Sequence, residues 1–212
     1  MAVSQKTIEK IKTQTDVFEN IKVFVRGNSK LGEGNMLIFN LPPILTCRPT
    51  KWCMQNCYGM KANHTFSNVI KSNETRYQMS LRDDFVANAM TELDKYKNVM
   101  YIRIHSTGDY YSQLYVEKWA EIVKTFPDKK FLSFTKRYDL VKPLRKLAGL
   151  SNMSMFESMD ESKQRARTMF KIARVKPEHH VTNEKEFECP GGCPDCGYEC
   201  WNTDRNVIFH KH

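Results

Sequence analysis

Cysteine placement constrains this chain more than any other sequence feature, because all seven cysteines fall in two short segments. The first cysteine group contains Cys47, Cys53 and Cys57, and the second cysteine group contains Cys189, Cys193, Cys196 and Cys200. Thiols this close in sequence are expected to face a common position, usually that of a metal ion or cluster. Four soft ligands close such a site, whereas three leave one coordination position open.

The first cysteine group has the spacing C-x5-C-x3-C. Only its second pair meets the C-x2-4-C spacing typical of zinc sites, whereas iron–sulfur loops tolerate wider spacing. The alternative interpretation is three buried free cysteines in a tight turn. Tyr58 directly follows Cys57. Its ring is expected to cover a bound cofactor, and the alternative is that Tyr58 is a core residue at the start of the next helix.

The second cysteine group places four thiols within residues 189–200, together with Gly191, Gly192 and Gly197, which allow the backbone to wrap closely around them. This run is closer to a ferredoxin type than to a zinc ribbon, whose cysteine pairs are separated by roughly 12–20 residues. Three arrangements stay open: one cluster served by both groups, two separate clusters, or a zinc site without chemistry.

Composition favours a cytoplasmic protein that has no membrane anchor. The 212 residues are 41% hydrophobic and 27% charged, which fits a single domain with residues 176–205 as a Cys-rich appendage. The N-terminal sequence has no apolar signal region, and no apolar run approaches the roughly 18 residues that span a bilayer. Reduced thiols and an odd cysteine count indicate metal ligands rather than disulfides.

The formal net charge of +9 permits nucleic-acid or phosphate partners. The lysines are scattered, however, and no RNP, helix-turn-helix or finger motif accompanies them. Nucleic-acid binding is therefore an expectation without motif support, and a solvated basic surface is the alternative.

Apolar periodicity predicts strands that alternate with helices. Short apolar runs predict strands at 36–43, 98–105, 129–136, 152–160, 171–175 and 206–212. Helical spacing predicts helices at 4–24, 80–96, 114–126, 139–147 and 161–170. Strands of this kind are typical of a parallel sheet, but they are too few for an eight-fold barrel. We expect an α/β fold with a partial, open parallel βα barrel.

Functional loops in such sheets lie beyond the carboxyl ends of the strands. The first cysteine group and the segment HSTGDYYS (105–112) are both expected there. Asp109 is a candidate to hold an amino group or ribose hydroxyl, and the alternative is a helix N-cap. His105 is a candidate catalytic residue or a core histidine. Further candidates lie at the ends of later strands: Thr135, Lys136, Arg137, Glu157 and Asp160. Surface solvation is the expected role of Lys136, and helix capping is the expected role of Asp160.

Several of these segments resemble the bacteriophage gene product 88 family. The resemblance rests on GNSKLGEGNMLIFNLPPILTC, WCMQNCYGMKA, IRIHSTGDYYS and the C-terminal cysteines ending in CW, over residues 26 to 201. It implies a phage origin, and hence the host cytoplasm, rather than a particular activity.

The layout is also similar to that of radical S-adenosylmethionine enzymes, whose usual motif is C-x3-C-x2-C. That resemblance implies a [4Fe–4S] cluster on the first cysteine group and S-adenosylmethionine held near Thr107, Gly108 and Asp109. It also implies an auxiliary cluster on the second cysteine group.

Two functions follow as expectations. The first is a redox or radical-type enzyme whose open iron binds a small-molecule ligand, with His105, Asp109 and Tyr58 lining the site. The second is a non-catalytic module in which zinc or a closed cluster staples the fold and the basic surface binds nucleic acid or a host protein.

Overall fold

The structure is a computed structural model that describes residues 22–32, 34–160, 168–177 and 179–210. Most of the helix predicted at 4–24 and most of the one predicted at 161–170 lie outside these ranges.

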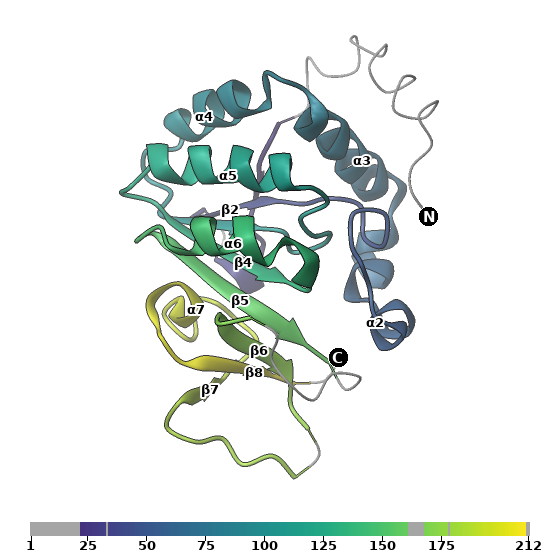
Figure 1. Ribbon diagram of the computed structural model, residues 1–212, viewed down its shortest axis with the longest axis vertical. Helices are drawn as coiled ribbons and strands as arrows, with labels where there is room; N and C mark the ends of the chain where they lie inside the picture. Colours follow the sequence, from purple (N-terminus) through teal and green to yellow (C-terminus); the bar gives the residue numbers. More distant parts are fainter. Residues whose placement is uncertain (1–21, 33, 161–167, 178, 211–212) are drawn as a thin grey trace.

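A single eight-stranded sheet organises the described chain, with the strand order β1-β2-β3-β4-β5-β6-β8-β7 (Figure 1). Only β1 is antiparallel to its neighbour, and the other pairs are parallel. The strands are Val25–Arg26 (β1), Met36–Phe39 (β2), Tyr101–Ile104 (β3), Lys130–Thr135 (β4), Met153–Met159 (β5), Lys171–Val175 (β6), Glu186–Glu188 (β7) and Asn206–Phe209 (β8).

The predicted α/β class and parallel sheet are confirmed, since all six predicted strands are present. Sequence periodicity missed β1 and β7, which have only two and three residues and are too short to show an alternation. These two strands form the edges of the sheet, so the described strands make an open sheet.

The helices connect successive parallel strands. They are Lys51–Asn56 (α2), Ser67–Leu81 (α3), Phe85–Lys95 (α4), Gln113–Thr125 (α5), Val141–Ala148 (α6) and Glu199–Asn202 (α7). The predicted helix at 80–96 in fact starts at Phe85, because a non-helical turn separates the end of α3 at Leu81 from the start of α4. Its predicted residue Leu81 is the last residue of α3. Figure 1 shows α4, α5 and α6 stacked along the sheet, with α2 beyond the tip of β5.

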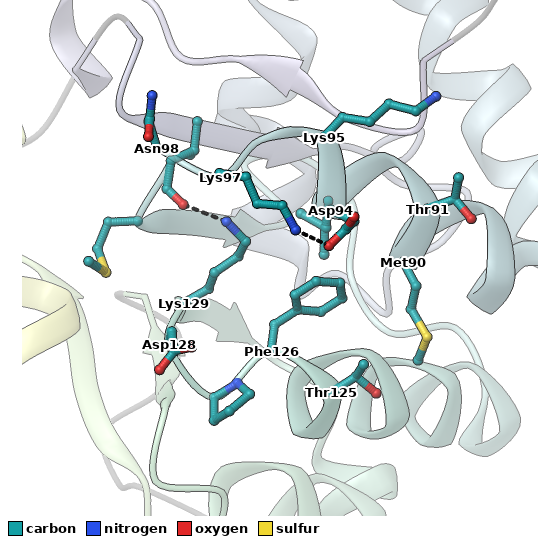
Figure 2. A pocket seen from close by; sticks show the side chains of 14 residues that line it. Met90, Thr91, Asp94, Lys95, Lys97, Asn98, Thr125, Phe126, Asp128 and Lys129 are labelled. Carbon is teal, nitrogen blue, oxygen red and sulfur yellow. Dashed lines mark hydrogen bonds and ion pairs between the residues drawn. The ribbon is translucent and has the colours of Figure 1, made fainter.

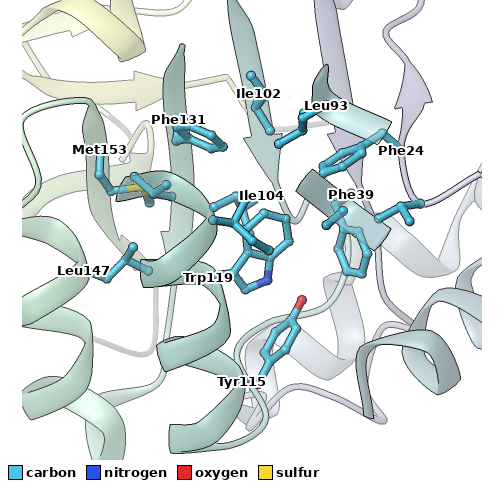
Figure 3. Close-up of a cluster of buried hydrophobic side chains, with 14 of the residues drawn as sticks. Phe24, Phe39, Leu93, Ile102, Ile104, Tyr115, Trp119, Phe131, Leu147 and Met153 are labelled. Atoms are coloured by element: carbon cyan, nitrogen blue, oxygen red, sulfur yellow. The ribbon is translucent and has the colours of Figure 1, made fainter. Parts of the chain in front are cut away.

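The helix face of the sheet carries the larger apolar core (Figure 3). Phe39 and Ile104 point from β2 and β3 toward Trp119 of α5, and all three are fully buried. The aromatic rings meet edge to face, with 5.2 Å between the ring centroids of Phe39 and Trp119. This packing fixes the strand register, since a shift of one residue would move these side chains to the opposite face of the sheet.

The opposite face of the sheet is covered by the C-terminal segment. Met36, Ile38 and Leu132 alternate with the helix-face residues and pack against Cys200 and Trp201 of α7. Residues far apart in sequence therefore build this second core, and the second cysteine group lies against it. Among the helices that the structure describes, none combines the length and hydropathy needed to cross a bilayer.

Candidate functional site at the carboxyl edge of the sheet

The first cysteine group lies directly after β2, at the carboxyl edge of the parallel strands. Thr50 is the N-cap of α2, and its Oγ1 accepts a hydrogen bond of 3.0 Å from the Cys53 amide. Cys57 is the C-cap residue of α2 and precedes the short 3-10 helix Tyr58–Met60. All three thiols are free and partly accessible to solvent. The short helix thus presents Cys53 and Cys57 about one turn apart, the spacing at which residues share a helix face.

Asp109, in the loop after β3, is a buried anchor for this edge. Its Oδ1 accepts hydrogen bonds from Thr135 Oγ1 at 2.8 Å and from the Tyr110 amide at 2.7 Å, and its Oδ2 accepts one from the Lys136 amide at 2.8 Å. Its own amide donates to Thr46 Oγ1 at 3.4 Å, one residue before Cys47. Burial raises the pKa of the Asp109 carboxyl, and the Lys136 amide opposes that shift most.

The prediction that Asp109 caps the next helix is wrong, because Ser112 is the N-cap of α5 and accepts from the Tyr115 amide. The carboxylate already binds three donors and is 5% exposed. Thr107 is similarly engaged, since its Oγ1 donates to the Leu41 carbonyl at 3.0 Å. The residues of this loop therefore do not fit the expected role of holding the amino group of S-adenosylmethionine.

A second anchor comes from the end of β5. Asp160 Oδ2 accepts a hydrogen bond of 2.7 Å from Thr50 Oγ1, and it lies 3.7 Å from Lys136 Nζ. Lys136 Nζ also donates to Ser158 Oγ at 3.1 Å, and its side chain is 17% exposed. The expectation that Lys136 is a solvated surface residue is therefore wrong. Sequence reasoning missed Thr50 as a site residue and expected a solvated role for Lys136, because their partner Asp160 is 110 and 24 residues away along the chain.

Electrostatic coupling links the thiols of the first cysteine group. The pKa of Cys47 is raised to about 12, mainly by burial and secondarily by the charges of Asp109, Cys53 and Cys57. Burial also raises the pKa of Cys53, whereas the ammonium of Lys136 lowers it. Thiolates that raise one another's pKa lie close together, and a cation placed among them would relieve that repulsion.

The second cysteine group is held on the opposite face of the sheet. The Cys193 amide donates to the Lys30 carbonyl at 2.7 Å, and the Cys189 amide donates to the Ile208 carbonyl at 2.8 Å. Cys200 is buried in α7, and its carbonyl accepts from Ser154 Oγ at 2.6 Å. The Tyr198 ring stacks on Tyr101 with 4.0 Å between centroids. Packing against β3 and β5 therefore positions this loop.

Arg103, in the middle of β3, couples to the second group. Burial raises the pKa of Cys193 to about 11 and that of Cys200 to about 12, and the Arg103 guanidinium opposes both shifts. Arg103 lies 5.3 Å from the ring centroid of Phe134 and also lowers the pKa of His64, although burial lowers it more. The thiols of each group couple to one another, and the described couplings join no thiol of one group to the other. The two groups therefore form two separate sets of interacting thiols.

The donor chemistry of both groups fits a thiophilic metal or an iron–sulfur cluster, because free thiols are gathered within each group. The side chains are not fully converged. No three His, Cys, Asp or Glu side chains among the described residues face one position closely enough to hold a metal ion. Metal binding at either group would therefore require the thiols to move toward one another.

His105 and Tyr58 occupy different environments. His105 is 3% exposed on the helix face, where its Nε2 lies 2.8 Å from the Tyr115 hydroxyl. Burial lowers the pKa of His105 to about 3, so its imidazole is neutral at physiological pH. The structure thus places His105 in the core rather than beside the thiols. Tyr58 is 47% exposed, and its ring meets His64 edge to face at 4.3 Å.

The remaining sequence candidates are bound within the fold. Arg137 is buried, forms an ion pair of 2.8 Å with Asp139 and donates a hydrogen bond to the Tyr110 carbonyl of the loop after β3. Glu157 is also fully buried, and it accepts from the Thr168 amide at 2.7 Å. Both therefore join neighbouring segments of the fold. The helix expected after Asp160 lies largely outside the described residues, so its capping stays a prediction.

A separate cavity of about 800 Å³ lies at the amino edge of the sheet (Figure 2). It is lined by the end of α4 and by the segments that lead into β3 and β4. Lys129 in its wall donates to the Tyr96 and Val99 carbonyls, at 2.8 Å each, and so stabilises the turn after α4. No cysteine lines this cavity, so it is distinct from the thiol sites.

These observations define an α/β protein with a mostly parallel sheet and two separate groups of free thiols. The sequence profile of the family described as gene product 88 matches residues 18–203, and the chain belongs to this family.

Two relatives are both named Gene 88 protein. The protein of Mycobacterium phage L5 is 24% identical over 234 aligned residues, covering 94% of this chain and 97% of the relative. The protein of Mycobacterium phage D29 is 27% identical over 145 residues, covering 63% of this chain and 60% of the relative. The match thus spans about 60% of the length of the D29 protein. No solved structure matches the chain.

Proposed function

We propose that this protein binds an iron–sulfur cluster through the first cysteine group and works as a redox or radical-type enzyme in the host cytoplasm. The supporting observation is that Asp109 and Asp160 tie the segment carrying three free thiols to the carboxyl edge of a parallel sheet. Loops at this edge carry the ligand sites of open α/β sheets. When bound, such a cluster would supply an iron with one coordination position open to a small ligand.

The chain's own residues would orient the loop and balance its charge. Thr50 fixes the start of α2 by accepting from the Cys53 amide and donating to Asp160. Lys136 places an ammonium group near Cys53, where it favours the thiolate that a metal requires. Asp109 acts through position only, because its oxygens bind Thr135, Tyr110 and Lys136.

For the second cysteine group we propose a structural role, with zinc or a closed cluster held by four thiolates. Cys200 is 8% exposed and packs in the apolar cluster of the opposite face with Trp201. Four thiolates leave no open coordination position, which is typical of structural sites. A metal bound here would stabilise the packing of the C-terminal segment against β3 and β5.

Anaerobic purification followed by metal analysis tests both proposals. We expect a broad absorption band near 400 nm and on the order of four irons with matching sulfide per cluster. Cys53→Ser should remove the iron of the first site and leave the metal of the second, whereas Cys196→Ser should do the reverse. Gln55→Ala, on the exposed side of α2, is the matched control and should retain both. A colourless protein that carries only zinc would contradict the iron–sulfur proposal.

A further inference from the structure

The segment around the first cysteine group is strongly basic. No Asp or Glu occurs between Gly34 and Asn73, whereas four permanent cations do, and we name these the loop cations: Arg48, Lys51, Lys61 and Lys71. Arg48 lies 3.4 Å from Asp139, yet its side chain is 69% exposed. The three lysines are exposed and have no ion-pair partner among the described residues. Their charge is therefore available to an external anion.

The same segment exposes large apolar side chains. Six of the ten exposed large hydrophobic residues of the described chain fall within residues 45–70: Leu45, Met54, Tyr58, Met60, Phe66 and Ile70. Such concentration of apolar surface in one short stretch indicates an interaction site, since isolated exposed residues would be spread over the molecule.

One ring of this surface has an aromatic neighbour, since Tyr58 meets His64 edge to face, whereas Phe66 is the exposed N-cap residue of α3. The turn after Tyr58 packs closely against the loop after β3, because an added Cβ at Gly59 would lie 2.9 Å from Thr107 Cγ2. Figure 1 shows α2 at the end of the sheet near the base of α3, so the segment forms one border of the molecule.

We propose that this surface, residues 45–71, binds single-stranded nucleic acid. The loop cations would contact backbone phosphates, and the exposed faces of Tyr58 and Phe66 would stack on unpaired bases. Cations interleaved with exposed rings are the combination that single-strand binding uses. Duplex nucleic acid would satisfy the cations but would leave the rings without bases to stack on. An acidic protein would likewise use the charge without needing the rings.

Fluorescence anisotropy with a labelled 20-nucleotide oligothymidine tests this proposal, with a 20-base-pair duplex and poly-glutamate as competitors. We expect the single strand to bind at least about tenfold more tightly than the duplex at equal salt. The triple variant Lys51→Glu, Lys61→Glu, Lys71→Glu should lose at least about tenfold in affinity. Its slope of log affinity against log salt should also fall by roughly two, because about 0.7 counterions are released per contacted phosphate.

Two further variants separate charge from stacking. A triple variant of equal charge on exposed α6 residues, Lys142→Glu, Arg145→Glu, Lys146→Glu, should change affinity less than about threefold, because it alters only the long-range field. The double variant Tyr58→Ala, Phe66→Ala should weaken single-strand binding about tenfold without changing the salt slope. Circular dichroism and thermal melting confirm that each variant is folded.

Several outcomes would overturn the proposal. One is equal affinity for the duplex and the single strand, and another is an equal loss of single-strand affinity in the two triple variants. A third is displacement of the oligothymidine by poly-glutamate at matched charge, which would identify an acidic protein as the partner. Iron content and oligothymidine affinity are measured on the same wild-type protein. A protein that lacks iron but binds the single strand would contradict only the iron–sulfur proposal, and a protein that carries iron but does not bind the single strand would contradict only this one.

Discussion

The Thr50 hydroxyl donates a 2.7 Å hydrogen bond to the Asp160 carboxylate, and this contact joins the start of α2 to the end of β5 across 110 residues of sequence. The same hydroxyl oxygen accepts from the Cys53 amide at 3.0 Å. One side chain therefore sets both the start of the helix that carries the thiols and its attachment to the sheet.

Thr50→Ala should loosen the first cysteine group. Loss of the N-cap costs about 1 kcal/mol of unfolding free energy, and the buried Asp160 oxygen loses a donor. We expect a lower urea midpoint and faster alkylation of Cys53 in metal-free protein, as measured by peptide mass spectrometry. Thr125→Ala is the control, because its hydroxyl bonds only to the Glu121 carbonyl on an exposed helix end. Equal effects of the two substitutions would contradict the anchoring role.

Gly108→Ala should destabilise the fold more than Gly34→Ala. Both glycines have positive φ angles, 85° and 90°. An added Cβ at Gly108 would lie 2.5 Å from Leu41 Cβ, whereas nothing lies within 4 Å at Gly34. We expect about 1 kcal/mol for Gly34→Ala from backbone strain and a further 1–3 kcal/mol for Gly108→Ala from overpacking. Chemical denaturation measures both, and equal losses would mean that the two loops do not pack as described.

His105 should make the fold sensitive to acid. Its folded pKa is lowered to about 3 by burial, against 6.5 for the free side chain. Between these values the unfolded chain binds more protons than the folded one, so stability falls as pH falls below 6.5, by at most about 1.4 kcal/mol per pH unit.

His105→Asn removes this titration and tolerates the positive φ of 65° at this position. We expect lower stability at pH 7 but a flatter decline between pH 6.5 and pH 4.5, as measured by urea unfolding. An unchanged slope in His105→Asn would show that His105 is not the group responsible.

Arg103→Gln should slow the alkylation of the second cysteine group in metal-free protein. The guanidinium lowers the pKa of Cys189, Cys193 and Cys200 against the larger effect of burial. Its removal decreases the thiolate fraction, and we expect alkylation about two- to tenfold slower at pH 8. Cys47 and Cys53 provide the internal control. Equal slowing of both groups would contradict the separation of the two sites.

Local sequence patterns determined the main elements of the sheet. The apolar runs at Met36–Phe39 and Lys130–Thr135 predicted buried parallel strands because such strands are covered on both faces. They also placed the first cysteine group and Asp109 after strand ends, where the structure has them. The two-residue strand β1 could not be predicted, since its residues Val25 and Arg26 pair with Ile38 and Leu37 of β2, 13 and 11 residues further along the chain.

The roles of individual polar residues depended on contacts that no local pattern contains. Asp109 has the sequence context of a helix cap, yet it binds Thr135 and Lys136 of the next strand end. Lys136 resembles a surface lysine, yet Asp160 and Ser158 hold it at the carboxyl edge. Hydrophobic periodicity and cysteine spacing are local properties, so the amino-acid sequence alone was enough to predict the α/β class and the two groups of thiols. Which thiols couple, and which carboxylates are buried anchors, depends on hydrogen bonds and burial that arise where distant strand ends meet in the folded chain.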